Sequence, residues 1–375
     1  MRALRRGRWI PVALPIAAIA LAAVLLWWRG PSIDAVAAVF RAVSWTWVGA
    51  ALALNVVSVI ARSLAWRTVI EQSMPPPRPR YRYVFSAFSV GLLANAVLPG
   101  RIGEVARVAV VARRLPRRGG SWPTLMGTVF AHRVFDLVAV LLLVPYVLVA
   151  ARIPPWALTS IALLAATAVV LVVFAFAGAR PHQLGLREGL GVVRRWLTMA
   201  RNGLAVMREP FAAATAIALQ CVGWGLQLLA VYAAMRAFRI DEPLHAAGLV
   251  LVLMNVATIF PLWPGNVGLV QAAVALPLLS YGIDYPHGFA FGLGLQAIEA
   301  SVGAGLGLLF LAREGLSLAM LRRLPPSEAP PERSPAGDTA RSRVTGLPQG
   351  RARGAARGAR ARRGAPPRRR GGGRA

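Results

Sequence analysis

Long apolar stretches decide what this chain can fold into. A helix needs about 20 mainly apolar residues to cross a bilayer, and six uninterrupted stretches of the 375-residue chain come close to that length. With 57% hydrophobic residues, the chain is more apolar than most soluble domains. We therefore predict an all-α, polytopic membrane protein. The predicted spans are residues 10–28, 45–66, 124–150, 156–178, 211–236 and 288–312.

Two further apolar stretches, about 84–112 and 245–280, are interrupted at their centres by similar short polar sequences. Both sequences contain the motif Pro-Gly-x-x-Gly, which begins at Pro99 in the first and at Pro264 in the second. Unpaired backbone groups in hydrocarbon cost several kcal/mol, so a helix break at membrane depth must face protein or a water-filled cavity. Paired Gly/Pro breaks also point to a transporter's binding site. We predict two re-entrant hairpins in an inverted pseudo-repeat, within about eight membrane helices or segments.

Arginine placement predicts the topology, because cytoplasmic loops carry the excess of basic residues. Arginines are concentrated before residue 10, with four of them there, and in residues 67–83 and 180–210. We therefore place the N-terminus and these two segments in the cytoplasm. A hairpin that re-enters keeps the arginine-rich residues 101–118 there as well. The second hairpin then enters from the other side, and both termini of this cell-membrane protein are cytoplasmic. Segment 180–210 is either an amphipathic surface helix or a solvated connector.

The C-terminal part is rich in Arg, Pro and Gly, and its last 35 residues, 341–375, contain twelve arginines and no acid. So little apolar surface cannot offset the entropy of ordering the chain. We predict a transmembrane domain at 1–320 and a disordered cytoplasmic tail at 321–375. The tail is a candidate for contact with anionic headgroups, at about 1 kcal/mol per basic residue, or serves only to enforce topology. Basic tails also attract nucleic acid, but we do not expect that partner here.

Ionisable residues inside membrane segments are costly and are functional hypotheses by default. Arg101, Glu104 and Arg107 follow the first break at successive i, i+3 positions. Guanidinium groups bind phosphate in a bidentate manner, and free amides at the start of a broken helix add donors for an anion. The pattern predicts a phosphate cradle. For Arg107, marking the cytoplasmic boundary is an equal alternative.

Four further charged residues belong to the predicted spans. Arg133 and Asp136 share a helix face and can pair, either to lock helices together or to contact substrate. Arg62 lies near the cytoplasmic end of its span and either snorkels to the headgroups or faces the hairpin. Glu299 is isolated within the last span, so we expect it to be neutralised or paired with Arg101 or Arg133.

The second break contains no charge, and Asn266 and Gln271 supply neutral donors and acceptors instead. Gly303 and Gly307 form a GxxxG pattern that predicts close packing of the last span. The candidate substrate-binding residues are Arg62, Asn95, Pro99, Gly100, Arg101, Gly103, Glu104, Arg107, Arg133, Asp136, Pro264, Gly265, Asn266, Gly268, Gln271 and Glu299.

The sequence contains no phosphate-binding P-loop, no His-Glu-x-x-His, no Gly-x-Ser-x-Gly and no Cys-x-x-Cys motif. Its single cysteine, Cys221, leaves no partner for an internal disulfide, and its four histidines lack ligand spacing. We therefore expect a protein that is not an enzyme, with no catalytic residue, no cofactor and no metal site.

The broken segments also carry a resemblance. Residues Asn95 to Arg107 (NAVLPGRIGEVAR), Arg133-x-x-Asp136, and Pro261 to Gln271 (PLWPGNVGLVQ) resemble the lysylphosphatidylglycerol synthase transmembrane, or flippase-like, family. The resemblance covers about residues 10–313 and implies an eight-helix membrane domain with two re-entrant hairpins. In bifunctional members this domain is linked to movement of aminoacylated phospholipid between leaflets. Other members are stand-alone proteins that are tied to polyprenyl-phosphate-linked sugars or have an unknown role.

Two departures from the family pattern matter. Asn266 replaces a glycine, and Gln271 stands where the family's second hairpin usually has a glutamate. We also expect a stand-alone member, because no soluble aminoacyltransferase domain follows the membrane part of this sequence.

These observations predict an integral membrane protein that translocates or binds a phosphate-bearing lipid between leaflets. The lipid is an aminoacylated phospholipid or a polyprenyl-phosphate-linked species, so the expected partners are an anionic phospholipid or polyprenyl-phosphate lipid and the membrane itself. The alternative is a non-transporting subunit that recruits or regulates a lipid- or glycan-modifying enzyme through 180–210 and the tail. Deleting 325–375 separates the two, since only the second function depends on the tail. A third, weaker alternative is a small-molecule secondary transporter.

Overall fold

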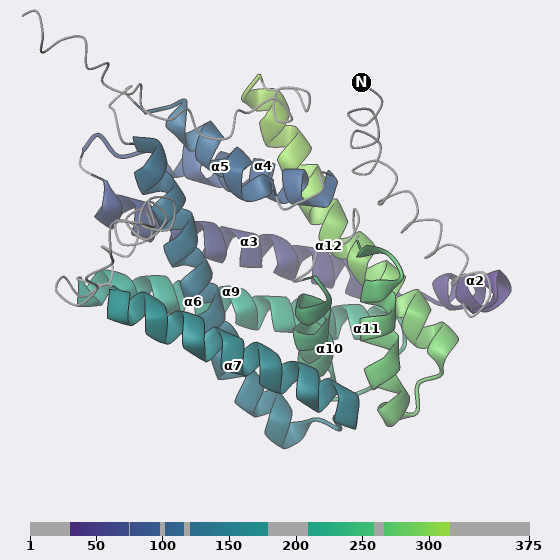
Figure 1. Cartoon of the computed structure of the whole chain (residues 1–375). Helices are drawn as coiled ribbons and strands as arrows, with labels where there is room; N and C mark the ends of the chain where they lie inside the picture. The colour runs from purple at the N-terminus through teal and green to yellow at the C-terminus, as the bar shows by residue number, and fades with distance from the viewer. Residues whose placement is uncertain are drawn as a thin grey trace, which may run out of the picture. The chain divides into compact units, whose positions relative to one another are not determined.

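The computed structural model describes residues 31–74, 76–97, 102–115, 121–178, 209–258 and 266–315. Within these ranges all regular structure is helical, which confirms the predicted all-α class (Figure 1). The predicted span 10–28, nearly all of segment 180–210 and the predicted tail 321–375 lie outside the described residues. The elements are α2 (Ile33–Arg41), α3 (Trp45–Ser73), α4 (Tyr81–Val97), α5 (Gly103–Ala112), α6 (Ser121–Ala150), α7 (Pro155–Gly178), α9 (Pro210–Ala237), α10 (Leu244–Ala257), α11 (Leu269–Leu278), the 3-10 turn η5 (Leu279–Tyr281) and α12 (Tyr285–Arg313).

In the described part of the chain, five helices are long and apolar enough to cross a membrane: α3, α6, α7, α9 and α12. They coincide with five of the six predicted spans, whereas the total of about eight segments stays a prediction. These helices expose large apolar side chains on their outer surface. An example is Leu163 of α7, of which 69% is exposed. Exposed leucine is unfavourable in water, at about 25 cal/mol per Å² of apolar surface, but costs nothing against lipid tails.

Helices α3 and α9 run antiparallel along each other and form the centre of the helical assembly (Figure 1). At one end the Ser44 amide donates to the Ala237 carbonyl over 2.9 Å. Nearer the middle, the Ser58 hydroxyl donates to the Gly223 carbonyl over 2.8 Å. Gly223 allows this close approach, since a Cβ there would lie 2.5 Å from Cγ of Arg62. Small residues serve the same purpose in other membrane helix pairs.

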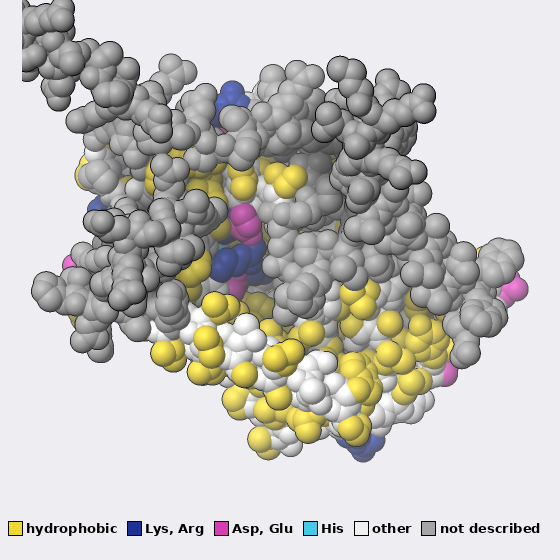
Figure 2. All heavy atoms as spheres, in the orientation of Figure 1, with side chains coloured by type: hydrophobic (Ala, Val, Ile, Leu, Met, Phe, Trp, Pro, Cys, Tyr) yellow, Lys and Arg dark blue, Asp and Glu magenta, His cyan; other side chains and the backbone are white. Residues whose placement is uncertain are grey.

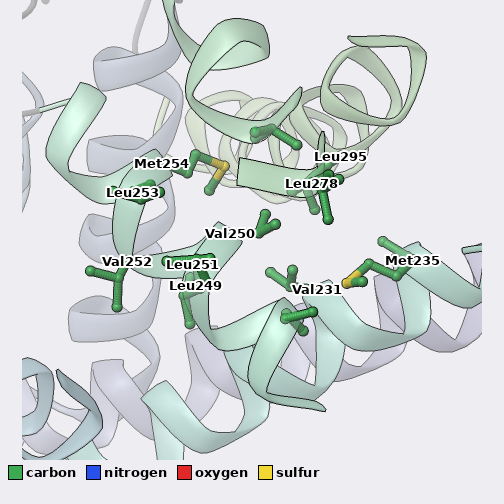
Figure 3. Close-up of a cluster of buried hydrophobic side chains, with 14 of the residues drawn as sticks. Val231, Met235, Leu249, Val250, Leu251, Val252, Leu253, Met254, Leu278 and Leu295 are labelled. Carbon is green, nitrogen blue, oxygen red and sulfur yellow. The ribbon is translucent and has the colours of Figure 1, made fainter. Parts of the chain in front are cut away.

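The short helices are sheltered by protein. Helix α4 packs on α5, and α10 packs on α11. In α10 every residue from Ala246 to Met254 is buried, which is typical of a helix that is apolar all round and enclosed by neighbours. Figure 3 shows its side chains in one hydrophobic cluster with those of α9, α11 and α12. With 14 residues, α10 is shorter than the about 20 that a span needs.

Contact with protein is what a helix break at membrane depth requires, so the packing of the short helices agrees with the predicted broken segments. The structure shows each predicted broken segment as two short helices packed on each other. Their re-entry into the bilayer from opposite faces stays a prediction.

Helix α12 packs tightly against α4 at two glycines. Gly303 lies against Leu92, and Gly307 lies against Leu93 and the Ser89 carbonyl oxygen, which would be 2.8 Å from an added Cβ. These contacts confirm the close packing that the GxxxG pattern predicted.

A matched pair of substitutions in α12 tests this packing. Gly307→Ala is expected to lower the free energy of unfolding, since overpacking costs about 1–3 kcal/mol and exceeds the gain of about 1 kcal/mol in helix propensity. Gly305 has nothing within 4 Å of an added Cβ, so Gly305→Ala should leave stability unchanged or raise it by up to about 1 kcal/mol. Thermal unfolding of the two purified variants in detergent measures the difference. Equal melting temperatures would contradict the packing argument.

Candidate functional site

Five charged side chains from α3, α5 and α6 form one connected group, which we call the charged cluster. It is assembled by helix packing, because α6 lies against both α3 and α5. Its members are Arg62, Glu104, Arg107, Arg133 and Asp136.

Asp136 is the centre of the charged cluster. Its Oδ1 accepts hydrogen bonds from Arg62 Nη2 at 3.0 Å, from Trp224 Nε1 at 3.0 Å and from Gln220 Nε2. Its Oδ2 accepts from Arg133 Nη1 at 3.1 Å, which confirms the predicted i, i+3 pair. A buried carboxylate is tolerated only when it is paired and hydrogen-bonded, and here four donors meet that requirement. Arg62 therefore faces the cluster next to the first hairpin, one of its two predicted alternatives.

Glu104 is the second carboxylate of the cluster. Arg133 Nη2 donates to its Oε1, and Arg107 Nη2 lies 2.6 Å from its Oε2. Arg133 thus bridges one carboxylate on α5 and one on α6. The guanidinium of Arg107 lies 4.7 Å from the ring centre of Trp66 and 5.6 Å from that of Phe88, a cation–π arrangement. Arg107 is therefore buried inside the helical assembly, and its alternative role at the cytoplasmic boundary stays a prediction.

Several donors of the cluster remain unused by the described residues. Arg62 Nε, Arg107 Nε and Arg107 Nη2 are buried without a hydrogen-bond partner there, and so is the acceptor Glu104 Oε2. In proteins nearly all buried polar groups are hydrogen-bonded, to protein, to water or to a ligand. The members of the cluster therefore leave three donors and one acceptor without a hydrogen bond among the described residues.

The cluster is basic overall and opens to one side. Among its five members three guanidinium groups face two carboxylates, which leaves one positive charge in excess within the cluster. Glu299, outside the cluster, also interacts electrostatically with Arg62. Arg133 is the most exposed member of the cluster, with 43% of the side chain accessible. Figure 2 shows acidic and basic side chains together in a hollow between hydrophobic ones, over α3 and α6. Low-dielectric walls around such a site strengthen its attraction for an anion.

The predicted residues of the first break hold the hairpin together. The Gly103 amide donates to Asn95 Oδ1 over 2.9 Å, so Asn95 caps the start of α5. One of the amides at the start of α5 is therefore already used by a side chain of the same hairpin, and the expected anion binding by amides of this helix start stays a prediction. Pro99, Gly100 and Arg101 lie outside the described residues, and their predicted roles stay predictions.

The predicted residues of the second break form a separate group of contacts. Gln271 Oε1 accepts from the Gly268 amide at 2.5 Å, and Gln271 Nε2 donates to Gln296 Oε1 at 2.6 Å. Asn266 has a left-handed backbone (φ 45°) and donates from Nδ2 to the Ala257 carbonyl at 3.1 Å. These bonds cap α11 and tie the break to α12. Pro264 and Gly265, also candidate residues, lie outside the described ranges.

Glu299 has a different partner from the expected one. Its Oε1 accepts from Gln227 Nε2 of α9 at 2.8 Å. Among the described residues this neutral amide, and not Arg133, is its hydrogen-bond partner. Of the expected outcomes, neutralisation or pairing with Arg101 or Arg133, the described residues show no hydrogen bond to Arg133. The other arginine considered for it, Arg101, is not described.

Sequence reasoning missed the contribution of α9. Gln220 and Trp224 both donate to Asp136, and Gln227 donates to Glu299. Two glutamine amides within a predicted apolar span were the available signal, because polar groups in such spans usually face partners inside the bundle. No local pattern paired them with a carboxylate on α6 or α12.

The five apolar helices and the charged cluster enclosed between them define a polytopic α-helical membrane protein. Within that class, the sequence model of the lysylphosphatidylglycerol synthase TM region matches residues 15–307. The match covers most of the chain, so the protein belongs to this family. A search of curated proteins and a search of solved structures gave no match.

Proposed function

We propose that this protein is a flippase-like lipid transporter that binds a phosphate-bearing lipid and moves it between the leaflets of the cell membrane. The lipid is an aminoacylated phospholipid or a polyprenyl-phosphate-linked species, and no covalent step is involved. The observation that carries the proposal is the charged cluster, whose arginines exceed its carboxylates and whose Arg133 is 43% exposed.

The physical need for such a cluster comes from the headgroup. A charge at the bilayer centre is costly, by about 2.5–3.5 kcal/mol or more on insertion scales. A guanidinium group offsets that cost by binding phosphate through two parallel hydrogen bonds. Glu104 and Asp136 hold Arg133 from two helices, so the arginine is oriented before the headgroup arrives. Such preorganisation improves affinity by reducing the entropy lost on binding.

The membrane arrangement is part of the same proposal. Both termini are cytoplasmic, and the hairpins α4–α5 and α10–α11 re-enter from opposite faces. Charges that belong to the first hairpin and to α6 then lie where a headgroup crosses. Family membership supports a lipid as the substrate, since the family is named after a lysylated phospholipid synthase.

Arg133→Gln tests the proposal. The substitution removes the exposed guanidinium but leaves Arg62 on Asp136 and Arg107 next to Glu104. A lost charge-assisted hydrogen bond is worth about 1.5–3 kcal/mol, so leaflet exchange should slow by about tenfold or more. The assay is exchange of a fluorescent phospholipid in vesicles that contain the purified full-length protein.

Arg67→Gln is the matched control. Arg67 is similarly exposed, at 40%, and also forms an ion pair, with Glu71 at 2.6 Å, but it is not a member of the charged cluster. Exchange by this variant should equal that of the unmodified protein. If Arg133→Gln moves lipid at the original rate, or if both variants are slowed equally, the proposal is wrong.

A further inference from the structure

We infer that the headgroup bound at the charged cluster is a net anion without an ammonium group. This choice between the two proposed lipid classes rests on the proposed function. It favours a phosphate-bearing lipid such as a polyprenyl phosphate or a plain anionic phospholipid over an aminoacylated one. The inference depends on which charges in the described helices are already in use.

A lysylated phospholipid headgroup places two ammonium groups beside one phosphodiester and is therefore a net cation. Recognition of such a group requires carboxylates that are free to accept from the ammonium groups, since like charges placed together cost several kcal/mol. The decisive question is thus whether the described helices contain carboxylates that lack an arginine.

Both carboxylates of the charged cluster are already engaged. Asp136 accepts from two arginines, a tryptophan and a glutamine. Glu104 is held by Arg133 at one oxygen, and its other oxygen, Oε2, is buried without a hydrogen bond but forms an ion pair with Arg107 Nη2 at 2.6 Å. An ammonium group could bind either acid only by displacing a guanidinium, which would leave that cation buried and unpaired. Breaking a buried pair in this way typically costs about 3–5 kcal/mol.

The second hairpin adds no carboxylate in its described parts, 244–258 and 266–278. The side-chain amide of Gln271 already accepts from the Gly268 amide and donates to Gln296. Glu299 is the remaining acid in the middle of a described membrane-spanning helix, and it accepts from Gln227. One carboxylate that already has a partner does not balance two ammonium groups.

The arginines of the charged cluster, in contrast, outnumber its carboxylates. Among the five members of the cluster one positive charge is in excess, and Arg133 is the arginine that a headgroup can reach, since 43% of its side chain is exposed. A phosphate supplies several acceptor oxygens and the missing negative charge. The geometry and the charge balance therefore select the same kind of headgroup.

The test compares three lipids on the purified full-length protein: phosphatidylglycerol, a polyprenyl phosphate and lysylphosphatidylglycerol, each in zwitterionic vesicles. Binding and leaflet exchange are measured separately. We expect both anionic lipids to bind with a Kd about tenfold or more below that of the lysylated lipid. Arg133→Gln should reduce this ratio, because the cluster then carries no excess positive charge.

Two results would overturn the inference and leave the proposed function intact. One is movement of lysylphosphatidylglycerol at least as fast as that of the anionic lipids. The other is a loss of its binding in Glu299→Gln that exceeds the loss for phosphatidylglycerol, since Glu299 would then receive the ammonium group. Selective binding of anionic lipids without any leaflet exchange would support the inference and disprove translocation. Equal binding of all three lipids would overturn the inference.

Discussion

Asp136→Ala is expected to lower the free energy of unfolding by about 3–5 kcal/mol, because removal of one partner from a buried ion pair leaves an uncompensated charge. Two arginines, Arg62 and Arg133, would lose their shared carboxylate, and the Trp224 and Gln220 donors would lose their acceptor. Leaflet exchange should be abolished, since Arg133 would no longer be held between two acids. Equilibrium unfolding of the purified protein in detergent measures the first effect, and vesicle exchange measures the second.

The control for this prediction is Glu71→Gln on α3. Glu71 also pairs with an arginine, Arg67, at 2.6 Å, but both side chains are partly exposed, at 29% and 40%. Exposed i, i+4 pairs contribute about 0.3–0.5 kcal/mol, so this variant should unfold almost like the original. A loss of less than about 1 kcal/mol for Asp136→Ala would mean that the charged cluster is not buried as the structure shows.

Gly103→Ala is expected to disrupt the first hairpin. An added Cβ at Gly103 would collide with the Gly91 carbonyl oxygen and with the side chain of Asn95, which caps α5. Overpacking costs about 1–3 kcal/mol, and loss of a helix cap adds about 1 kcal/mol. The gain in helix propensity on replacing glycine is at most about 1 kcal/mol, so destabilisation dominates. Glu104 follows directly in sequence, so leaflet exchange should fall together with stability.

Gly225→Ala is the matched control, because nothing lies within 4 Å of a Cβ built at that position of α9. It should keep both the melting temperature and the exchange rate. Normal exchange by a stable Gly103→Ala protein would contradict the role given to the close α4–α5 contact. Thermal unfolding and vesicle exchange on the two variants separate these outcomes.

Several features could be predicted from the sequence because they depend on neighbouring residues. A membrane span requires a continuous apolar length, so five of the six predicted spans coincide with observed helices. The Arg133–Asp136 pair follows from i, i+3 spacing on one helix, and the Gly303–Gly307 packing follows from the same periodicity. Local breaks at Pro-Gly predicted that α4 and α5, and α10 and α11, are separate helices.

Other features could not be predicted, because they depend on how distant helices are aligned. Arg62 and Asp136 are separated by 74 positions and pair only through the alignment of α3 on α6. Glu299 was expected to be neutralised or paired with Arg101 or Arg133, and the position of α12 beside α9 gives it a hydrogen bond from Gln227. Free amides were expected at the start of α5, and the fold-back of α4 on α5 brings Asn95 to one of them, the Gly103 amide.

By itself, then, the sequence determined that the chain is a bundle of long apolar helices with two interrupted segments, and which ionisable residues lie within its apolar segments. Hydrophobicity and helical periodicity act over short distances along the chain, and this is why these properties are visible in sequence. The tertiary structure alone decided which carboxylates neutralise which arginines among the described residues. Those pairings depend on the register of antiparallel helices, which is set by the packing of small residues such as Gly223 against distant neighbours.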